Sequence, residues 1–181
     1  MRKSEMSGRF TGVFYYFAGV TLTAKLFSRL PSILGTMQLA IADPVASLCG
    51  RLTRHIYWSR IEGSMGGLGR NKGFLGFLGG ALACVPVNFW MLKKAIWGGK
   101  SPSNGKLAAL SVLTGAAGSF ADLIVPTPNI KMPDKVWGVK MPPLHVDDNF
   151  VIPLVTAGVV ELFTRWLNVD GETKFSDFLF F

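Results

Sequence analysis

Five apolar runs, separated by polar or glycine-rich segments, dominate the pattern of hydrophobic and polar positions along the chain. A helix needs about 20 predominantly apolar residues to cross a bilayer, and each run is close to that length. The pattern therefore predicts an all-α, polytopic transmembrane bundle that forms a single membrane domain. The predicted spans cover residues 10–27, 30–50, 73–92, 107–125 and 149–167, and an aromatic tail follows at 168–181.

Composition strengthens the membrane interpretation. Hydrophobic residues make up 49% of the 181 residues, charged residues only 17%, and the mean hydropathy is +0.35. A soluble domain normally carries about 25% charged residues. The net charge of +8 is compatible with nucleic-acid binding, but no basic stripe interleaved with aromatic residues and no recognition-helix pattern accompanies it. We therefore expect membrane lipids as partners, no nucleic acid, and positive charge that faces headgroups or phosphates.

Acidic residues lie where a membrane protein tolerates them least. Asp43 lies inside the second apolar run, Asp122 lies inside the fourth, and Asp147 and Asp148 open the fifth. A carboxylate at bilayer depth costs about 2.5 kcal/mol or more, so such residues are usually paired, solvated in a cavity or used for chemistry. These four residues are the first candidates for a functional site.

If the spans alternate in direction, all four acids lie near one membrane face. The same face receives the N-terminus and the loops 51–72 and 126–148, which together carry more than half of the 19 basic residues. The positive-inside tendency places this face in the cytoplasm or its organellar equivalent. Carboxylates, cationic side chains and glycine-rich backbone near a helix start are the parts that a phosphate site with a divalent cation requires.

Structural interpretations of the same acids remain open at this point. Asp147 and Asp148 ahead of a helix can serve as capping residues, which stabilise a helix start by about 0.3–1 kcal/mol. Asp43 precedes Pro44, and an Asp-Pro pair often restarts a helix after a break. Asp122 is the hardest to explain structurally, because it lies near a predicted helix end, where an acid opposes the macrodipole.

Other features favour packing over chemistry. Glu161 is expected to pair with Arg165 four residues later on the same helix. The small residues Gly76, Gly79 and Gly80 are expected to let neighbouring helices approach closely.

Four segments, in the correct order, resemble the CTP-dependent lipid-alcohol kinases, a family that includes dolichol kinase, phytol kinase and the CTP-using diacylglycerol kinase. Ala42–Arg51 looks like the family's Asp-x-x-Ala-Ser-x-x-Gly segment, and Lys72–Gly80 resembles its Lys-Ser-x-x-Gly-x-x-x-Gly segment. Leu113–Asp122 resembles the helix that ends in an acidic residue. Asp147–Leu154 is similar to the Asp-Asp-Asn-x-x-x-Pro segment, the most specific of the four.

The resemblance implies transfer of the γ-phosphoryl group of CTP to the hydroxyl of a long-chain lipid alcohol, with Mg²⁺ as the metal. It implies that Asp43 and Asp148 are catalytic. The implied Mg²⁺ ligands are Asp43, Asp122, Asp147 and Asp148. The residues implied to contact CTP are Ser47, Gly50, Arg51, Arg70, Lys72 and Gly76.

Departures from the family pattern keep a second function open. Lys72 is followed by Gly73 where the family has serine, Asp122 stands where the family more usually has glutamate, and the family has additional N-terminal spans. The alternative is a catalytically inactive member that binds only lipid and serves as an accessory subunit of a larger membrane complex. The endoplasmic reticulum, the mitochondrial inner membrane and a plastid are all compatible locations.

Overall fold

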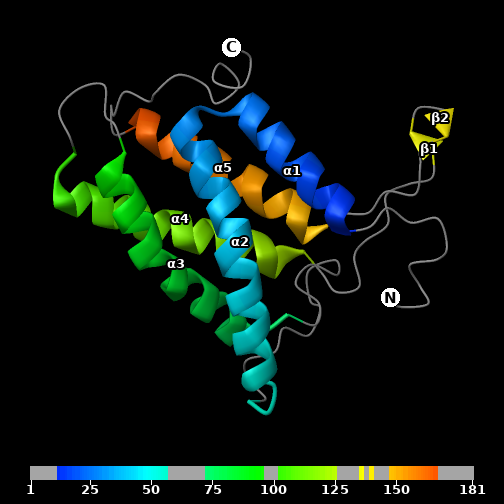
Figure 1. Cartoon of the computed structure of the whole chain (residues 1–181). Helices are drawn as coiled ribbons and strands as arrows, with labels where there is room; N and C mark the ends of the chain where they lie inside the picture. Colours follow the sequence, from blue (N-terminus) through cyan, green and yellow to red (C-terminus); the bar gives the residue numbers. More distant parts are fainter. Residues whose placement is uncertain are drawn as a thin grey trace.

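The computed structural model describes residues 12–56, 72–95, 102–125, 135–136, 139–140 and 147–166. Within these ranges the chain forms five helices and one pair of two-residue antiparallel strands (Figure 1). The helices are α1 (Gly12–Leu26), α2 (Arg29–Leu52), α3 (Phe74–Lys94), α4 (Asn104–Ile124) and α5 (Asp148–Trp166). The strands are β1 (Lys135–Val136) and β2 (Val139–Lys140). The predicted all-α membrane bundle is confirmed, and the strand pair is an addition that the sequence did not predict.

Helix α2 is the centre of the bundle, because it contacts all four other helices. Helices α3 and α4 pack against each other and against α2, while α5 packs on α2 and α4 and carries α1 on its other side (Figure 1). Successive helices run in opposite directions (Figure 1). The end of α2 therefore lies at the same end of the bundle as the starts of α3 and α5 and the end of α4.

Membrane-spanning character differs among the helices. By length and composition, α2, α3 and α4 are apolar enough to cross a membrane, within the described parts of the chain. Helix α1 has 15 residues as described and α5 has 19, and α5 carries Glu161 and Arg165 near its end. All five helices match the predicted apolar runs closely, but the assignment of five spans stays a prediction.

Glycines set the distances between the helices. A methyl group placed on Gly76 would lie 2.8 Å from the carbonyl oxygen of Ala46, and one on Gly115 would lie 2.7 Å from that of Ala81. Such contacts let two helix backbones approach more closely than larger side chains allow. The packing role predicted for Gly76 is therefore supported by its contact with α2.

A buried polar network joins the three central helices. The Gln38 side-chain amide of α2 donates to Asn88 Oδ1 of α3 over 2.8 Å, and Asn88 Nδ2 donates to the Ser111 carbonyl of α4 over 3.2 Å. Each of these three side chains is almost completely buried. Hydrogen bonds of this kind fix the register of membrane helices at modest energetic gain. An apolar core lies near the starts of α2 and α4 and the end of α3. It is formed by Leu30, Leu34, Leu92, Leu107, Leu110 and Val160.

Candidate functional site

Three carboxylates from three helices meet at one end of the bundle. One oxygen each of Asp43 (α2), Asp122 (α4) and Asp148 (α5) lies within 4.8 Å of the other two. We call these residues the carboxylate cluster. Asp122 is buried, with 5% of its surface exposed, while Asp43 and Asp148 are half-buried. The convergence expected from alternating helix directions is thus present in the structure for these three acids.

The helices position these acids by simple means. Asp122 lies in the last turn of α4, and Asp148 is the first residue of α5. Asp43 lies inside α2, which continues through Pro44 to Leu52 without a break. Asp43 therefore does not cap a restarted helix, and the alternative based on the Asp-Pro pair is wrong.

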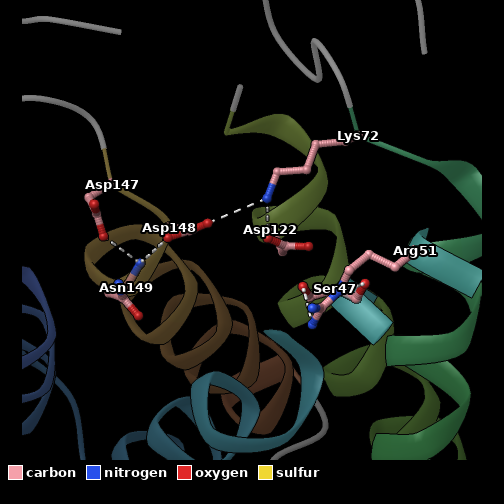
Figure 2. Close-up of polar contacts among 7 residues, drawn as sticks. All are labelled: Ser47, Arg51, Lys72, Asp122, Asp147, Asp148 and Asn149. Carbon is pink, nitrogen blue, oxygen red and sulfur yellow. Dashed lines mark hydrogen bonds and ion pairs between the residues drawn. The ribbon is translucent and has the colours of Figure 1, made fainter. Parts of the chain in front are cut away.

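Lys72 places a positive charge beside Asp122 and Asp148, two members of the carboxylate cluster (Figure 2). Its ammonium Nζ lies 2.6 Å from Asp122 Oδ1 and 3.4 Å from Asp148 Oδ2. Burial disfavours the charged ammonium, but the carboxylates of Asp122 and Asp148 outweigh it and raise the pKa of Lys72 above its ordinary value. Lys72 is therefore a cation at neutral pH, and it balances part of the negative charge of the cluster.

Asp147 has a different environment from its neighbour. Its Oδ1 accepts a hydrogen bond from the backbone N–H of Asn149 over 3.0 Å, as does Asp148 Oδ1 (Figure 2). The carbonyl of Asp147 accepts from the N–H groups of Phe150 and Val151. These contacts are typical of the residue that caps a helix start. Among the described residues Asp147 does not belong to the carboxylate cluster, so its role as a metal ligand stays a prediction.

Ser47 and Arg51 continue the face of α2 that begins at Asp43. Arg51 donates from Nε to the Ser47 carbonyl over 3.2 Å and from Nη2 to Ser47 Oγ over 3.4 Å (Figure 2). Both side chains are exposed. The spacing of four residues from Asp43 to Ser47, and again to Arg51, gives one stripe along the helix.

The remaining predicted contacts to CTP divide into three cases. Gly50 faces open space, because an added methyl group would meet no atom within 4 Å. Gly76 lies against the Ala46 carbonyl in the contact between α2 and α3. Arg70 lies outside the described residues. Of the two glycines, Gly50 is the one that leaves free room, near the end of α2.

An apolar layer forms the floor of the carboxylate cluster. Leu39 lies one turn before Asp43 in α2, and Ile152 lies one turn after Asp148 in α5; both are buried and pack together with Ala121. Charges beside such a layer interact more strongly than charges in water, because the local dielectric is lower.

The donor set fits a hard divalent cation. Mg²⁺ binds carboxylate oxygens at about 2.1 Å, so two oxygens on one ion lie at most about 4.2 Å apart. The oxygens of the carboxylate cluster lie within 4.8 Å of one another, which is close to that limit. A site with only a few protein ligands also suits Mg²⁺, because this ion usually completes its coordination shell with water and substrate phosphate.

Sequence reasoning missed two features of the site. It assigned Lys72 to phosphates and did not foresee the ion pairs with Asp122 and Asp148. It also overlooked the apolar floor, although the spacing of Leu39 and Ile152 one turn from Asp43 and Asp148 was a usable signal.

Comparison with known proteins finds a similarity to a lipid kinase. Over 165 residues the chain is 26% identical to CTP-dependent diacylglycerol kinase 1 of Schizosaccharomyces pombe. The aligned region covers 90% of this chain and 64% of that kinase. The chain is similar to a CTP-dependent lipid kinase. No protein-family model and no solved structure matches it.

This similarity supports the resemblance drawn from the four segments, at the level of CTP-dependent lipid kinases. Together with the three apolar helices, it supports an integral membrane protein that contacts lipids.

Proposed function

We propose that this protein is a membrane-embedded kinase that transfers the γ-phosphoryl group of CTP to the hydroxyl of a lipid alcohol. The observation that carries the proposal is the meeting of Asp43, Asp122 and Asp148 at one end of an apolar bundle. The similarity to a CTP-dependent diacylglycerol kinase supports CTP as the donor and a lipid as the acceptor. The acceptor is a diacylglycerol or a long-chain alcohol such as dolichol or phytol.

The carboxylate cluster would hold a divalent cation, with Mg²⁺ favoured by its oxygen ligands. When bound, this cation supplies charge neutralisation for the phosphates of CTP. Phosphoryl transfer requires little covalent work from the protein and depends on positioning and electrostatic stabilisation. An apolar floor of Leu39, Ala121 and Ile152 strengthens that stabilisation by lowering the local dielectric.

Asp43 is the best candidate for orienting the attacking hydroxyl. Asp122 and Asp148 both accept hydrogen bonds from Lys72, whereas the Asp43 carboxylate accepts none within the residues that the structure describes. In the proposed step the acceptor oxygen bonds to the γ-phosphorus while the bond from that phosphorus to the β–γ bridging oxygen breaks. CDP leaves, and the hydroxyl proton passes to Asp43.

The phosphates of CTP would lie between the end of α2 and the start of α3. Arg51 is exposed on the last turn of α2, and no side chain of the described residues caps the first turn of α3. Free N–H groups at a helix start favour phosphate oxygens. Arg70, two residues before Lys72 in the sequence, is a further candidate that the resemblance implies. The acceptor would reach Asp43 laterally from the bilayer, since α2 is one of the membrane-crossing helices.

Transfer of label from γ-labelled CTP to lipid tests the proposal directly. The purified full chain in lipid nanodiscs would be offered diacylglycerol, dolichol and phytol separately, with Mg²⁺. We expect one class of acceptor to be labelled, and Asp43→Asn and Asp148→Asn to abolish labelling. Glu161→Gln, which removes an acid at the far end of α5, is the matched control and should retain transfer.

Absence of labelled lipid from γ-labelled CTP with all three acceptors would contradict the proposal. Stable co-purification with other membrane subunits, combined with that absence, would favour the accessory-subunit role.

A further inference from the structure

The position of the Lys72 ammonium bears on how a cation reaches the carboxylate cluster. Its Nζ is 2.6 Å from Asp122 and 3.4 Å from Asp148, and these are two of the three residues that offer oxygens to a metal ion. An ammonium at hydrogen-bond distance occupies the same two carboxylates that a cation would use, and its charge opposes a second positive charge beside them. The two positive charges therefore compete for one set of ligands.

Electrostatics makes this competition strong. A cation bound to Asp122 and Asp148 at about 2.1 Å would be close to an ammonium that still contacts the same carboxylates. Like charges at that separation repel strongly in a site with an apolar floor. Lys72 must leave the carboxylates before a divalent ion binds tightly.

We propose that Lys72 holds the place of the divalent cation and couples cation binding to the arrival of the nucleotide triphosphate. This inference rests on the proposed function, because it requires a triphosphate to receive the displaced ammonium. Without nucleotide, Lys72 stays on Asp122 and Asp148 and the cation binds weakly. With nucleotide, the phosphates accept the ammonium, and the freed carboxylates bind the cation.

The chemistry of lysine suits this exchange. Its ammonium is a compact point charge on a flexible four-carbon stem, so it can turn from one anionic partner to another. Lys72 lies two residues before α3, which begins at Phe74 after the extended residue Gly73. The phosphates proposed to lie at the first turn of α3 are thus within reach of the same side chain.

Coupling of this kind is reciprocal and can be measured without turnover. Binding of Mn²⁺ would be followed by the electron paramagnetic resonance signal of the free ion, using the full chain in nanodiscs. Each titration would be made with and without β,γ-imido-CTP, which does not transfer its phosphoryl group. If nucleotide raises the affinity for Mn²⁺, Mn²⁺ raises the affinity for nucleotide by the same factor.

Lys72→Met is the decisive variant. We expect it to bind Mn²⁺ alone about tenfold or more tightly than the unmodified chain, because one competing charge is gone. We also expect the nucleotide analogue to raise its Mn²⁺ affinity by a smaller factor. Lys106→Met, at the exposed start of α4, is the matched control and should leave both quantities unchanged.

Unchanged or weaker binding of Mn²⁺ alone in Lys72→Met would overturn the inference. If that variant fails to fold, as judged by circular dichroism, Lys72→Arg decides instead. Arginine binds carboxylates with two parallel hydrogen bonds, so it should lower the affinity for Mn²⁺ alone; equal or tighter binding would overturn the inference.

The two proposals fail in different ways. If only the role of Lys72 is wrong, the unmodified chain still labels lipid and Asp43→Asn does not. If the kinase proposal is wrong, no lipid is labelled, whatever the Mn²⁺ titrations give.

Discussion

The two ends of α5 both carry acids, but the surroundings of these acids differ. At the start, Asp148 shares its site with Asp43 and Asp122, and Lys72 is the cation that the described residues place there. At the end, Glu161 accepts several hydrogen bonds, and no other acid of the described residues is recorded in contact with it. It accepts from the backbone N–H and hydroxyl of Ser28 and from Nε and Nη2 of Arg165.

The difference distinguishes an acid that stabilises the fold from acids that the fold keeps close together despite their mutual repulsion. Glu161 joins the start of α2 to the end of α5, and a charged arginine matches its charge. Within the described ranges, the carboxylate cluster places three acids around one ammonium, so negative charge is in excess among these residues. Like charges that are kept together at a cost to stability are typical of functional sites.

The largest expected effect is that of Asp43→Asn on phosphoryl transfer. We expect the rate to fall by about a hundredfold or more, because the amide cannot take the hydroxyl proton. Stability should hold or rise slightly, since one of three mutually repelling charges is removed. The lipid-labelling assay and thermal unfolding in detergent measure the two effects. Phosphoryl transfer at the full rate, or failure of the variant to fold, would show that Asp43 has a structural role like that of Glu161.

Gly76→Leu should damage the cluster end of the bundle through packing. A side chain at this position would meet the Ala46 carbonyl, and overpacking of a tight contact costs about 1–3 kcal/mol. We expect a lower unfolding temperature in detergent. Gly105→Leu, at a position with open space around it, is the control; equal stability of the two variants would count against close packing of α2 and α3.

Glu161→Gln should show the opposite pattern from Asp43→Asn. The neutral amide weakens the hydrogen bonds from Ser28 and Arg165, at a cost of about 1–2 kcal/mol for charge-assisted bonds. Lipid labelling should change less than about threefold, because Glu161 is at the far end of α5 from Asp148. Loss of transfer without loss of stability in Glu161→Gln would show that Glu161 also has a functional role, contrary to the proposed difference between the two ends of α5.

The smallest effect is expected for Arg165→Met. The Arg165 side chain is 77% exposed, and exposed ion pairs contribute about 0–1 kcal/mol. Ser28 continues to satisfy Glu161 in this variant. Unfolding temperatures at low and high salt measure the effect, and a loss as large as that of Glu161→Gln would show that Arg165, not Ser28, carries the contact.

Much of the fold was predictable because apolar runs of bilayer length leave little choice. The predicted span 30–50 became Arg29–Leu52, and 107–125 became Asn104–Ile124. The Glu161–Arg165 pair is also confirmed, since a spacing of four residues on a helix brings the two together.

The rest required three-dimensional information. The contact of Glu161 with Ser28 joins residues far apart in the sequence, and nothing in either local pattern indicates it. Pro44 suggested a helix break, but packing on the neighbouring helices keeps α2 continuous. For Lys72, the sequence showed a cation near acids and phosphates, but only the geometry shows that acids are its partners.

Stoichiometry of Mn²⁺ binding in the presence of β,γ-imido-CTP tests the central claim most directly. If Asp43, Asp122 and Asp148 form one site, the unmodified chain binds one tightly held ion, and changing any one of the three to asparagine removes it. Glu161→Gln keeps the ion. Retention of the ion in two of the three asparagine variants, or its loss in Glu161→Gln, would contradict a shared site at the start of α5.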